Sequence, residues 1–237
     1  MENIKVVAIT GATAGIGRAI ANRFAREGWA LALASRTASD LAEVKKEITD
    51  RYPQADVMVQ SIDVRKREAL KQFVQSIDSR WNRLDVLVNN AGVFIPGALL
   101  EEEDGNLELM VETNLYSSYY GTRAAMPLLE KSKPAHIFNM CSIASITAYP
   151  NGGSYAISKW AQLGWNNCLR AELKDENIKV TAILPGATWS RSWAGADLPP
   201  DRLMDAGHVA HMVYAAWDLP PKSTVEEIII RPQEGDL

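Results

Sequence analysis

The stretch Ile4–Gly17 reads IKVVAITGATAGIG and opens the first strand–turn–helix unit of the chain. Its first part, Ile4–Thr10, is apolar at nearly every position, which is typical of a strand buried on both faces of a parallel sheet. Glycines at positions 11, 15 and 17 allow a sharp turn, and a helical pattern follows over Gly17–Gly28. The free N–H groups at the start of such a helix favour a bound pyrophosphate. Because the spacing is G-x-x-x-G-x-G rather than G-x-G-x-x-G, a tight turn without a ligand is the alternative for this loop taken alone.

The same alternation of strand and helix continues along the whole chain. Further apolar runs are Trp29–Ser35, Ala55–Ile62, Leu84–Asn89, Ala135–Cys141, Ile178–Leu184 and Val225–Arg231. The helical patterns between them are Ser39–Tyr52, Lys66–Trp81, Asn106–Lys131, Gly153–Asn177 and Arg202–Trp217. Repeated right-handed βαβ units predict an α/β fold with a doubly wound sheet. We expect residues 1–237 to form a single Rossmann-like domain, with a seven-stranded, mainly parallel sheet and helices on both faces.

Composition excludes several classes of protein. The chain has 237 residues, 47% of them hydrophobic, and a formal net charge of −4, which gives no general attraction to nucleic acid or an anionic membrane. Its two cysteines, Cys141 and Cys168, cannot build a disulfide framework or a cysteine zinc site and fit a reducing compartment. The three histidines lack metal-ligand spacing, and no apolar run suits a signal peptide or a membrane span. We expect a cytoplasmic protein without a metal.

The end of the second expected strand predicts the cofactor. In dinucleotide-binding folds, an acidic residue about 20 positions after the glycine loop holds the ribose 2′-hydroxyl of NAD. This chain has Ser35-Arg36-Thr37 there instead. A serine hydroxyl and a guanidinium can both bind a 2′-phosphate. The pattern favours NADP(H), and a solvated arginine at a strand end is the alternative.

A second pattern carries proton-transfer chemistry. Tyr155 and Lys159 are spaced by one helical turn and therefore share a helix face. The free tyrosine pKa is about 10, and a neighbouring ammonium lowers it by stabilising the phenolate. Ser142 ends a strand thirteen residues upstream, at the carboxyl edge where parallel sheets bind ligands. A packing pair of tyrosine and lysine is the alternative for the helical motif alone.

Together, these motifs resemble those of the short-chain dehydrogenase/reductase family over almost the whole chain. The residues that carry the resemblance are Thr10–Gly17, Asp63-Val64, Asn89-Asn90-Ala91-Gly92, Asn114, Ser142, Tyr155-x-x-x-Lys159 and Pro185-Gly186. The resemblance implies that Tyr155 is the general acid/base and that Lys159 lowers its pKa and binds the nicotinamide ribose. It also implies that Ser142 orients the substrate oxygen and that Asn114 helps to hold a water for a proton relay.

The same resemblance implies a cofactor-binding set. Its expected members are Gly11, Thr13, Ala14, Gly15, Ile16 and Gly17 in the loop, Ser35 and Arg36 at the 2′-phosphate, Asp63 and Val64 at the adenine, Asn90, Ala91 and Gly92 along the dinucleotide, Pro185, Gly186, Thr188 and Ser190 at the nicotinamide, and Tyr155 with Lys159. Ala14 departs from the family, because many NADP-preferring members carry a basic residue there. The short tail after Val225–Arg231 departs from the glycine-rich ending of tetrameric members, which argues against the usual tetramer. We expect a homodimer through the long helical patterns.

The expected substrate is a small carbonyl or alcohol compound. In the family, the segment after Pro185-Gly186, here about residues 187–200, covers the substrate. Its Trp189 and Trp193, with Ser142, Phe94 and Tyr149 near strand ends, suggest an apolar, ring-containing compound. The alternative is that the two tryptophans only pack this segment onto the protein. Three functions stay open: an NADP(H)-dependent carbonyl reductase, a 3-oxoacyl-acyl-carrier-protein reductase, and a non-catalytic dinucleotide sensor.

Overall fold

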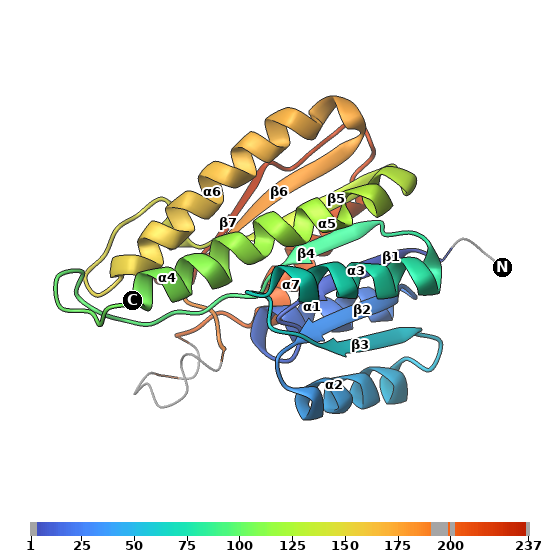
Figure 1. The fold of residues 1–237 in the computed structure, drawn as a ribbon, viewed down its shortest axis with the longest axis horizontal. Helices are drawn as coiled ribbons and strands as arrows, with labels where there is room; N and C mark the ends of the chain where they lie inside the picture. The colour runs from blue at the N-terminus through green and yellow to red at the C-terminus, as the bar shows by residue number, and fades with distance from the viewer. Residues whose placement is uncertain (1–3, 191–198, 200–201, 236–237) are drawn as a thin grey trace.

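A single parallel sheet organises the molecule in the computed structural model, which describes residues 4–190, 199 and 202–235 (Figure 1). Its strands are β1 Val6–Thr10, β2 Ala30–Ser35, β3 Val57–Ser61, β4 Val86–Asn89, β5 Ala135–Met140, β6 Ile178–Pro185 and β7 Glu227–Ile230. They lie in the order β3-β2-β1-β4-β5-β6-β7, and every neighbouring pair is parallel. The predicted seven-stranded doubly wound fold is confirmed. The order reverses beside β1, which is where open α/β sheets bind ligands.

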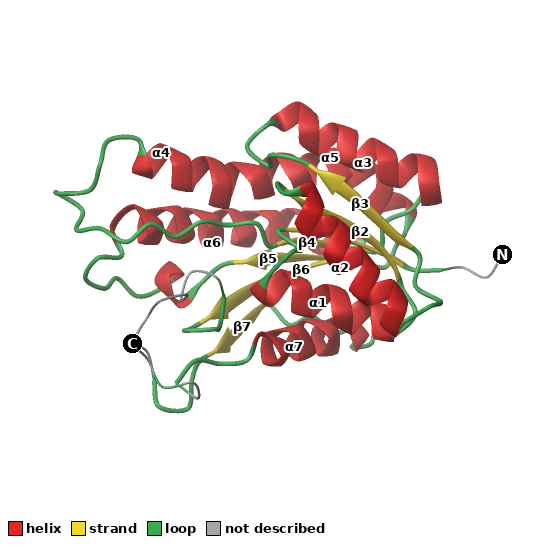
Figure 2. Ribbon diagram, turned by 90° about the horizontal axis from the view of Figure 1, so that it is seen from below, coloured by secondary structure: helices red, strands yellow, loops and turns green. Residues whose placement is uncertain are grey.

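Helices cover both faces of the sheet, as predicted. They are α1 Gly15–Arg26, α2 Ala38–Arg51, α3 Arg67–Trp81, α4 Asn106–Met110, α5 Ser117–Lys131, α6 Gly153–Leu173 and α7 Ala206–Asp218. One apolar cluster joins α1, α2 and α7 to the strand face that carries Val7 and Ile9, and the other joins α3 and α5 to the face that carries Val6 and Ala8. Figure 2 shows α3 and α5 on one side of the sheet and α1 and α7 on the other. Successive strand residues point to opposite faces, so each strand contributes to both cores.

Aromatic side chains fill the core beneath α1 and α7. Phe24 is fully buried and makes edge contacts with Trp29 and Tyr214, at ring-centroid distances of 4.9 and 5.3 Å. Trp217 packs edge-on against Trp29 at 5.0 Å. Trp160 on α6, by contrast, is 51% exposed. Trp29 and Trp217 therefore pack on the α1–α7 side, whereas Trp160 lies on the surface of α6.

Buried polar side chains are paired across the sheet. The Asn89 amide donates to Thr122 Oγ1 and to Asn139 Oδ1, at 2.9 and 2.8 Å, and the Asn139 amide donates to Asn166 Oδ1 at 2.9 Å. This amide ladder ties β4 and β5 to α5 and α6. The ladder gives these buried amides hydrogen-bond partners, and buried amides without partners would destabilise the core.

His136 on β5 is also fully buried, and it stacks on Phe138 at a ring-centroid distance of 3.9 Å. Its Nε2 lies 2.7 Å from Thr181 Oγ1, which itself donates to Val225 O. Nε2 therefore carries the proton. Burial, with a smaller contribution from Lys179, lowers the His136 pKa well below its ordinary value of 6.5.

Several helix boundaries differ from the sequence-based expectation, each for a local reason. The helix expected over Asn106–Lys131 contains a π-helical segment, Val111–Tyr116, between α4 and α5. The last long helix begins at Ala206 rather than at Arg202, because the Asp205 side chain caps the Gly207 N–H. α6 stops at Leu173, before a 3-10 turn that ends at Asn177 in a left-handed conformation. No helix among the residues described is long and apolar enough to cross a membrane.

Candidate active site

A pocket of about 750 Å³ lies at the carboxyl edge of the sheet. The ends of β1, β2, β4, β5 and β6 meet there because parallel strands all point to one edge. Predicted site residues that line it are Gly11, Thr13, Ala14, Gly15, Ile16, Ser35, Arg36, Asp63, Val64, Asn90, Ala91, Gly92, Phe94, Ser142, Tyr149, Tyr155, Lys159, Pro185, Gly186, Thr188 and Ser190. Residues from across the chain thus meet in one cavity. Gly17, Asn114 and Trp189 do not line it, and Trp193 lies outside the described residues.

The glycine loop forms one end of the pocket. Gly11 and Gly15 have φ values of +66° and +49°, in the left-handed region that favours glycine. A Cβ on Gly17 would lie 2.3 Å from Gly11 O and 2.5 Å from Asn90 Nδ2. Asn90 in turn donates to the carbonyl oxygens of Thr10 and Gly11. Gly17 therefore lies behind the loop and allows it to pack, and its expected contact with the cofactor stays a prediction.

The end of β2 supplies the cationic part of the pocket. Ser35 Oγ lies 3.1 Å from Thr13 Oγ1 of the glycine loop, and Arg36 beside it is exposed. Arg65 also lines the pocket and was missed from the sequence. Its guanidinium bonds both carboxylate oxygens of Asp63 and lowers the Asp63 pKa. Arg65 immediately follows the Asp63-Val64 motif, so that adjacency was the signal that could have found it.

The π-helical segment positions Asn114. Asn114 Oδ1 accepts a hydrogen bond from Val93 N at 2.8 Å, and its Nδ2 donates to Val93 O and to Ser158 Oγ at 3.1 and 2.9 Å. Asn114 is completely buried, so it braces the pocket wall from behind. π-helical turns occur frequently at functional sites because the extra residue per turn redirects a side chain. No periodicity in the sequence signalled this turn.

Ser142 is held by a short capping motif at the end of β5. Its hydroxyl accepts from Ala144 N at 3.1 Å, and its own N–H donates to Ser145 Oγ at 3.2 Å. The motif caps the 3-10 turn Ile143–Ser145 and fixes the Ser142 side chain, which is only 8% exposed. Burial raises the Tyr155 pKa, and the interaction of its phenol with the Ser142 side chain opposes that rise in part. Ser142 and Tyr155 therefore form one unit.

Tyr155 and Lys159 share a face of α6, as their spacing predicted. The Lys159 ammonium lies 5.8 Å from the Tyr155 ring centroid, and it donates to Met140 O at 2.7 Å and to Gln162 Oε1 at 2.8 Å. Burial raises the pKa of Tyr155 to about 12 and lowers the pKa of Lys159 to about 8. Ser142 offsets part of the rise in the Tyr155 pKa, and the lowering expected from Lys159 stays a prediction.

A carboxylate holds the start of α6 next to Tyr155. Glu102 Oε1 accepts from Ser154 N at 3.1 Å and from Ser154 Oγ at 2.6 Å. Glu102 Oε2 is buried and has no hydrogen-bond partner among the described residues. The segment after β4 is therefore fastened to the helix that carries Tyr155. The sequence contains no local signal for this contact, because 52 positions separate the two residues.

The remaining part of the pocket is largely apolar. Phe94 contacts Tyr155 edge-on at a centroid distance of 4.9 Å, and Tyr149 also lines the pocket. Side chains missed from the sequence include Val93, Leu109, Thr113, Ile143 and Thr147. Trp189 is 57% exposed and does not line this pocket, so its expected contact with substrate stays a prediction. Cys141, directly after β5, lines the pocket and packs with Leu163, Ala182 and Leu184, and burial raises its pKa to about 12.

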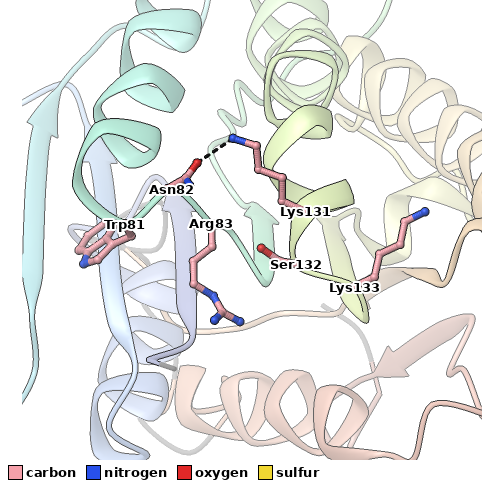
Figure 3. Close-up of a pocket in the computed structure, with 6 residues that line it drawn as sticks. All are labelled: Trp81, Asn82, Arg83, Lys131, Ser132 and Lys133. Atoms are coloured by element: carbon pink, nitrogen blue, oxygen red, sulfur yellow. Dashed lines mark hydrogen bonds between the residues drawn. The ribbon is translucent and has the colours of Figure 1, made fainter. Parts of the chain in front are cut away.

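A second, smaller pocket lies where α3 and α5 end, away from this site (Figure 3). Its polar lining includes Arg83, Lys131 and Lys133. Each of these cations is paired with a carboxylate, on Asp85, Asp78 and Glu176 respectively. These ion pairs neutralise the cations, and among the described residues the lining has no counterpart of Ser142, Tyr155 and Lys159 in the first pocket.

Comparison with known proteins identifies the family. Residues 5–197 match the family model for short chain dehydrogenases. The chain is 33% identical over 240 residues to a sepiapterin reductase from Chlorobaculum tepidum, with 98% of each chain covered. It is 33% identical over 184 residues to an NADP-dependent 3-hydroxy acid dehydrogenase from Escherichia coli K12, covering 76% of this chain and 71% of that one.

Its structure is similar to that of an alcohol dehydrogenase from the archaeon Thermococcus sibiricus, complexed with 5-hydroxy-NADP. The TM-score is 0.89, the sequence identity is 28%, and 97% of each chain is covered. The family model spans the glycine loop, Ser142, Tyr155 and Lys159. This chain belongs to the short-chain dehydrogenase/reductase family and is an oxidoreductase of that family.

Proposed function

We propose that this protein is an NADP(H)-dependent carbonyl reductase, which also oxidises the corresponding alcohol. The observation that carries the proposal is the convergence of Ser142, Tyr155 and Lys159 in one pocket with the glycine loop. The pocket fits a dinucleotide phosphate, since the first turn of α1 opens beside the loop and carries no acidic residue. The relative from E. coli is NADP-dependent by name, and the archaeal structure holds a modified NADP.

The chain's own residues supply the proton. Bound NADPH provides a hydride equivalent for the carbonyl carbon. Tyr155 donates its phenolic proton to the carbonyl oxygen, which becomes the alcohol hydroxyl. Ser142 hydrogen-bonds the same oxygen while it gains negative charge. Lys159 holds the nicotinamide ribose and offers positive charge to the phenolate that Tyr155 becomes.

Ser35 and Arg36 account for the preference for NADP(H). Both line the pocket at the end of β2, where a carboxylate would repel the 2′-phosphate. Charge-assisted hydrogen bonds contribute about 1.5–3 kcal/mol each, so R36A should weaken NADPH binding roughly tenfold to a hundredfold. NADH binding should change little, since NADH lacks the phosphate. Titration of nucleotide fluorescence measures both, and equal losses for the two nucleotides would refute this assignment.

An uncharged, apolar carbonyl compound fits the substrate side best. Its walls are Val93, Phe94, Leu109, Ile143 and Tyr149. The segment between Phe94 and Leu109 exposes the acidic side chains of Glu101, Glu103, Asp104 and Glu108. These carboxylates disfavour the phosphorylated arm of an acyl-carrier-protein substrate and the carboxylate of a 3-oxo acid. A ring-containing ketone is therefore the first candidate, and one of the relatives is a reductase of sepiapterin by name.

Two experiments test the proposal. A panel of ring-containing ketones, aldehydes, 3-oxo acids and acetoacetyl thioesters is assayed by NADPH consumption, with faster turnover expected for the uncharged ketones. The Y155F variant should lose turnover and keep NADPH binding, because Phe preserves the ring contact with Phe94. Unchanged turnover would refute the role of Tyr155. Binding without turnover of any substrate by the unmodified protein would favour a dinucleotide sensor.

We also propose that the active form is a single-domain subunit in a homodimer. One continuous sheet supports a single domain. Exposed Tyr116, Ile157 and Trp160, on the π-helical segment and α6, favour a dimer face. Light scattering should give twice the 26.1 kDa chain mass, and W160E should shift the population toward monomer. A monomeric unmodified protein would refute the dimer.

A further inference from the structure

A buried hydrogen-bond chain connects Lys159 to the backbone of Asn114. Lys159 Nζ donates to Gln162 Oε1 at 2.8 Å, and Gln162 Nε2 donates to Ser118 Oγ at 3.0 Å. Ser118 Oγ in turn donates to Asn114 O at 3.1 Å. Ser118 and Gln162 are 1% and 0% exposed. Neither side chain lines the pocket, so neither contacts a bound ligand directly.

The direction of this chain determines how the Gln162 amide is oriented. Because Ser118 uses its proton on Asn114 O, its oxygen is free to accept, and the Gln162 NH₂ group fills that place. The amide oxygen then faces the ammonium group. The reversed amide would put two donors against Lys159 and an acceptor against a hydroxyl whose proton is already engaged. Ser118 therefore selects the orientation of Gln162, and Gln162 presents an acceptor to Lys159.

Two acceptors fix where the lysine points. An ammonium group has three donors, and Met140 O and Gln162 Oε1 occupy two of them. The third points away from both, and Lys159 lines the pocket. We propose that Gln162 is a positioning residue that holds the Lys159 ammonium in the orientation and charge state its task requires. The inference rests on the proposed function, in which Lys159 holds the nicotinamide ribose.

The surroundings of Lys159 make the acceptor important. Lys159 is 4% exposed, and burial lowers its pKa to about 8, which is close to neutral pH. The titratable side chains that face it are Tyr155 on the same helix and Cys141 at the end of β5. Burial raises the pKa of both to about 12, so both are uncharged near neutrality. The positive charge is then supported chiefly by neutral oxygens, of which Gln162 provides one.

Two substitutions of Gln162 should shift the pKa of Lys159 in opposite directions. Q162M keeps the length of the side chain and removes the acceptor, so the pKa of Lys159 should fall by about one unit. Q162E places a carboxylate at the same position, and the pKa should rise by at least as much. S118A removes the group that orients the amide and should lower the pKa by less than Q162M does.

The measurement follows Lys159 itself in protein without nucleotide. The chain is labelled with carbon-13 at the lysine ε-carbon, the Lys159 signal is identified by its loss in K159R, and its pH titration is recorded for each variant. N166L is the matched control, since Asn166 is buried one turn further along α6 and bonds Asn139 instead. It should lower thermal stability and leave the Lys159 titration unchanged.

Failure of the inference and failure of the proposed function give different results. Identical Lys159 titrations in the unmodified protein, Q162M and Q162E would overturn the inference, and so would an equal shift in N166L. If the unmodified protein reduces no carbonyl compound, the proposed function fails while the titrations still report on Gln162. In an active enzyme, the alkaline limb of carbonyl reduction should move to lower pH in Q162M and to higher pH in Q162E. Identical alkaline limbs of the pH–rate profile in the unmodified protein, Q162M and Q162E would also overturn the inference.

Discussion

Replacing Gly17 by alanine tests how the glycine loop is packed. The new Cβ would lie 2.3 Å from Gly11 O and 2.5 Å from Asn90 Nδ2, both closer than real Cβ contacts. The first is backbone, and Asn90 is fixed by its bonds to Thr10 O and Gly11 O, so the loop itself must move. Overpacking of this kind costs about 1–3 kcal/mol. For a chain of this length, a loss of about 2 kcal/mol lowers Tm by roughly 4–8 °C.

Gly164 in α6 provides the matched control for G17A. It is also helical, but it is exposed, and apart from its chain neighbours and the nearby backbone of its own helix no heavy atom lies within 4 Å of the position its Cβ would take. An alanine there should stabilise the helix by up to about 1 kcal/mol, which raises Tm by roughly 2–4 °C. Thermal denaturation monitored by circular dichroism gives both shifts, and NADPH titration should show weaker binding in G17A only. Equal Tm values for G17A and the unmodified protein would refute the steric reasoning, as would a fall in Tm for G164A.

Three further predictions concern stability and the positioning of Tyr155. Because the folded protein disfavours protonation of His136, the free energy of unfolding should fall as pH drops below about 6.5, by up to about 1.4 kcal/mol per pH unit. H136Q should flatten this slope, which urea denaturation between pH 7 and pH 5 measures. An unchanged slope in H136Q would contradict the prediction. E102A leaves both Ser154 donors without their acceptor, so it should lower kcat with little change in the affinity for NADPH. E102Q keeps an acceptor oxygen and should recover most of kcat. Equal activity of the two variants would contradict this role of Glu102. F24A empties a site that is fully buried against Trp29 and should cost about 3–5 kcal/mol of unfolding free energy, well above the cost of F24L; similar losses in chemical denaturation would contradict the packing argument.

Local features of the sequence determined the architecture. The apolar runs and helical patterns predicted a doubly wound sheet because strand and helix periodicities are properties of short segments. Parallel strands end at one edge, so placing Ser35, Asn90, Ser142 and Pro185 at strand ends was enough to predict that they meet. Tyr155 and Lys159 followed from the helical spacing in the same way.

Only the tertiary structure decided which side chains support that site. Glu102 meets Ser154 across 52 positions, and Gln162 meets Ser118 across 44. The π-helical turn that carries Asn114 leaves no trace in the hydrophobic pattern, and neither does the close packing of Gly17 against Gly11 O and Asn90. These features depend on the register in which α5, α6 and the segment after β4 pack together. The packing of the complete core determines that register. The contacts of Glu102 and Gln162 join residues far apart in the chain, and such a separation leaves no periodic signal in the sequence.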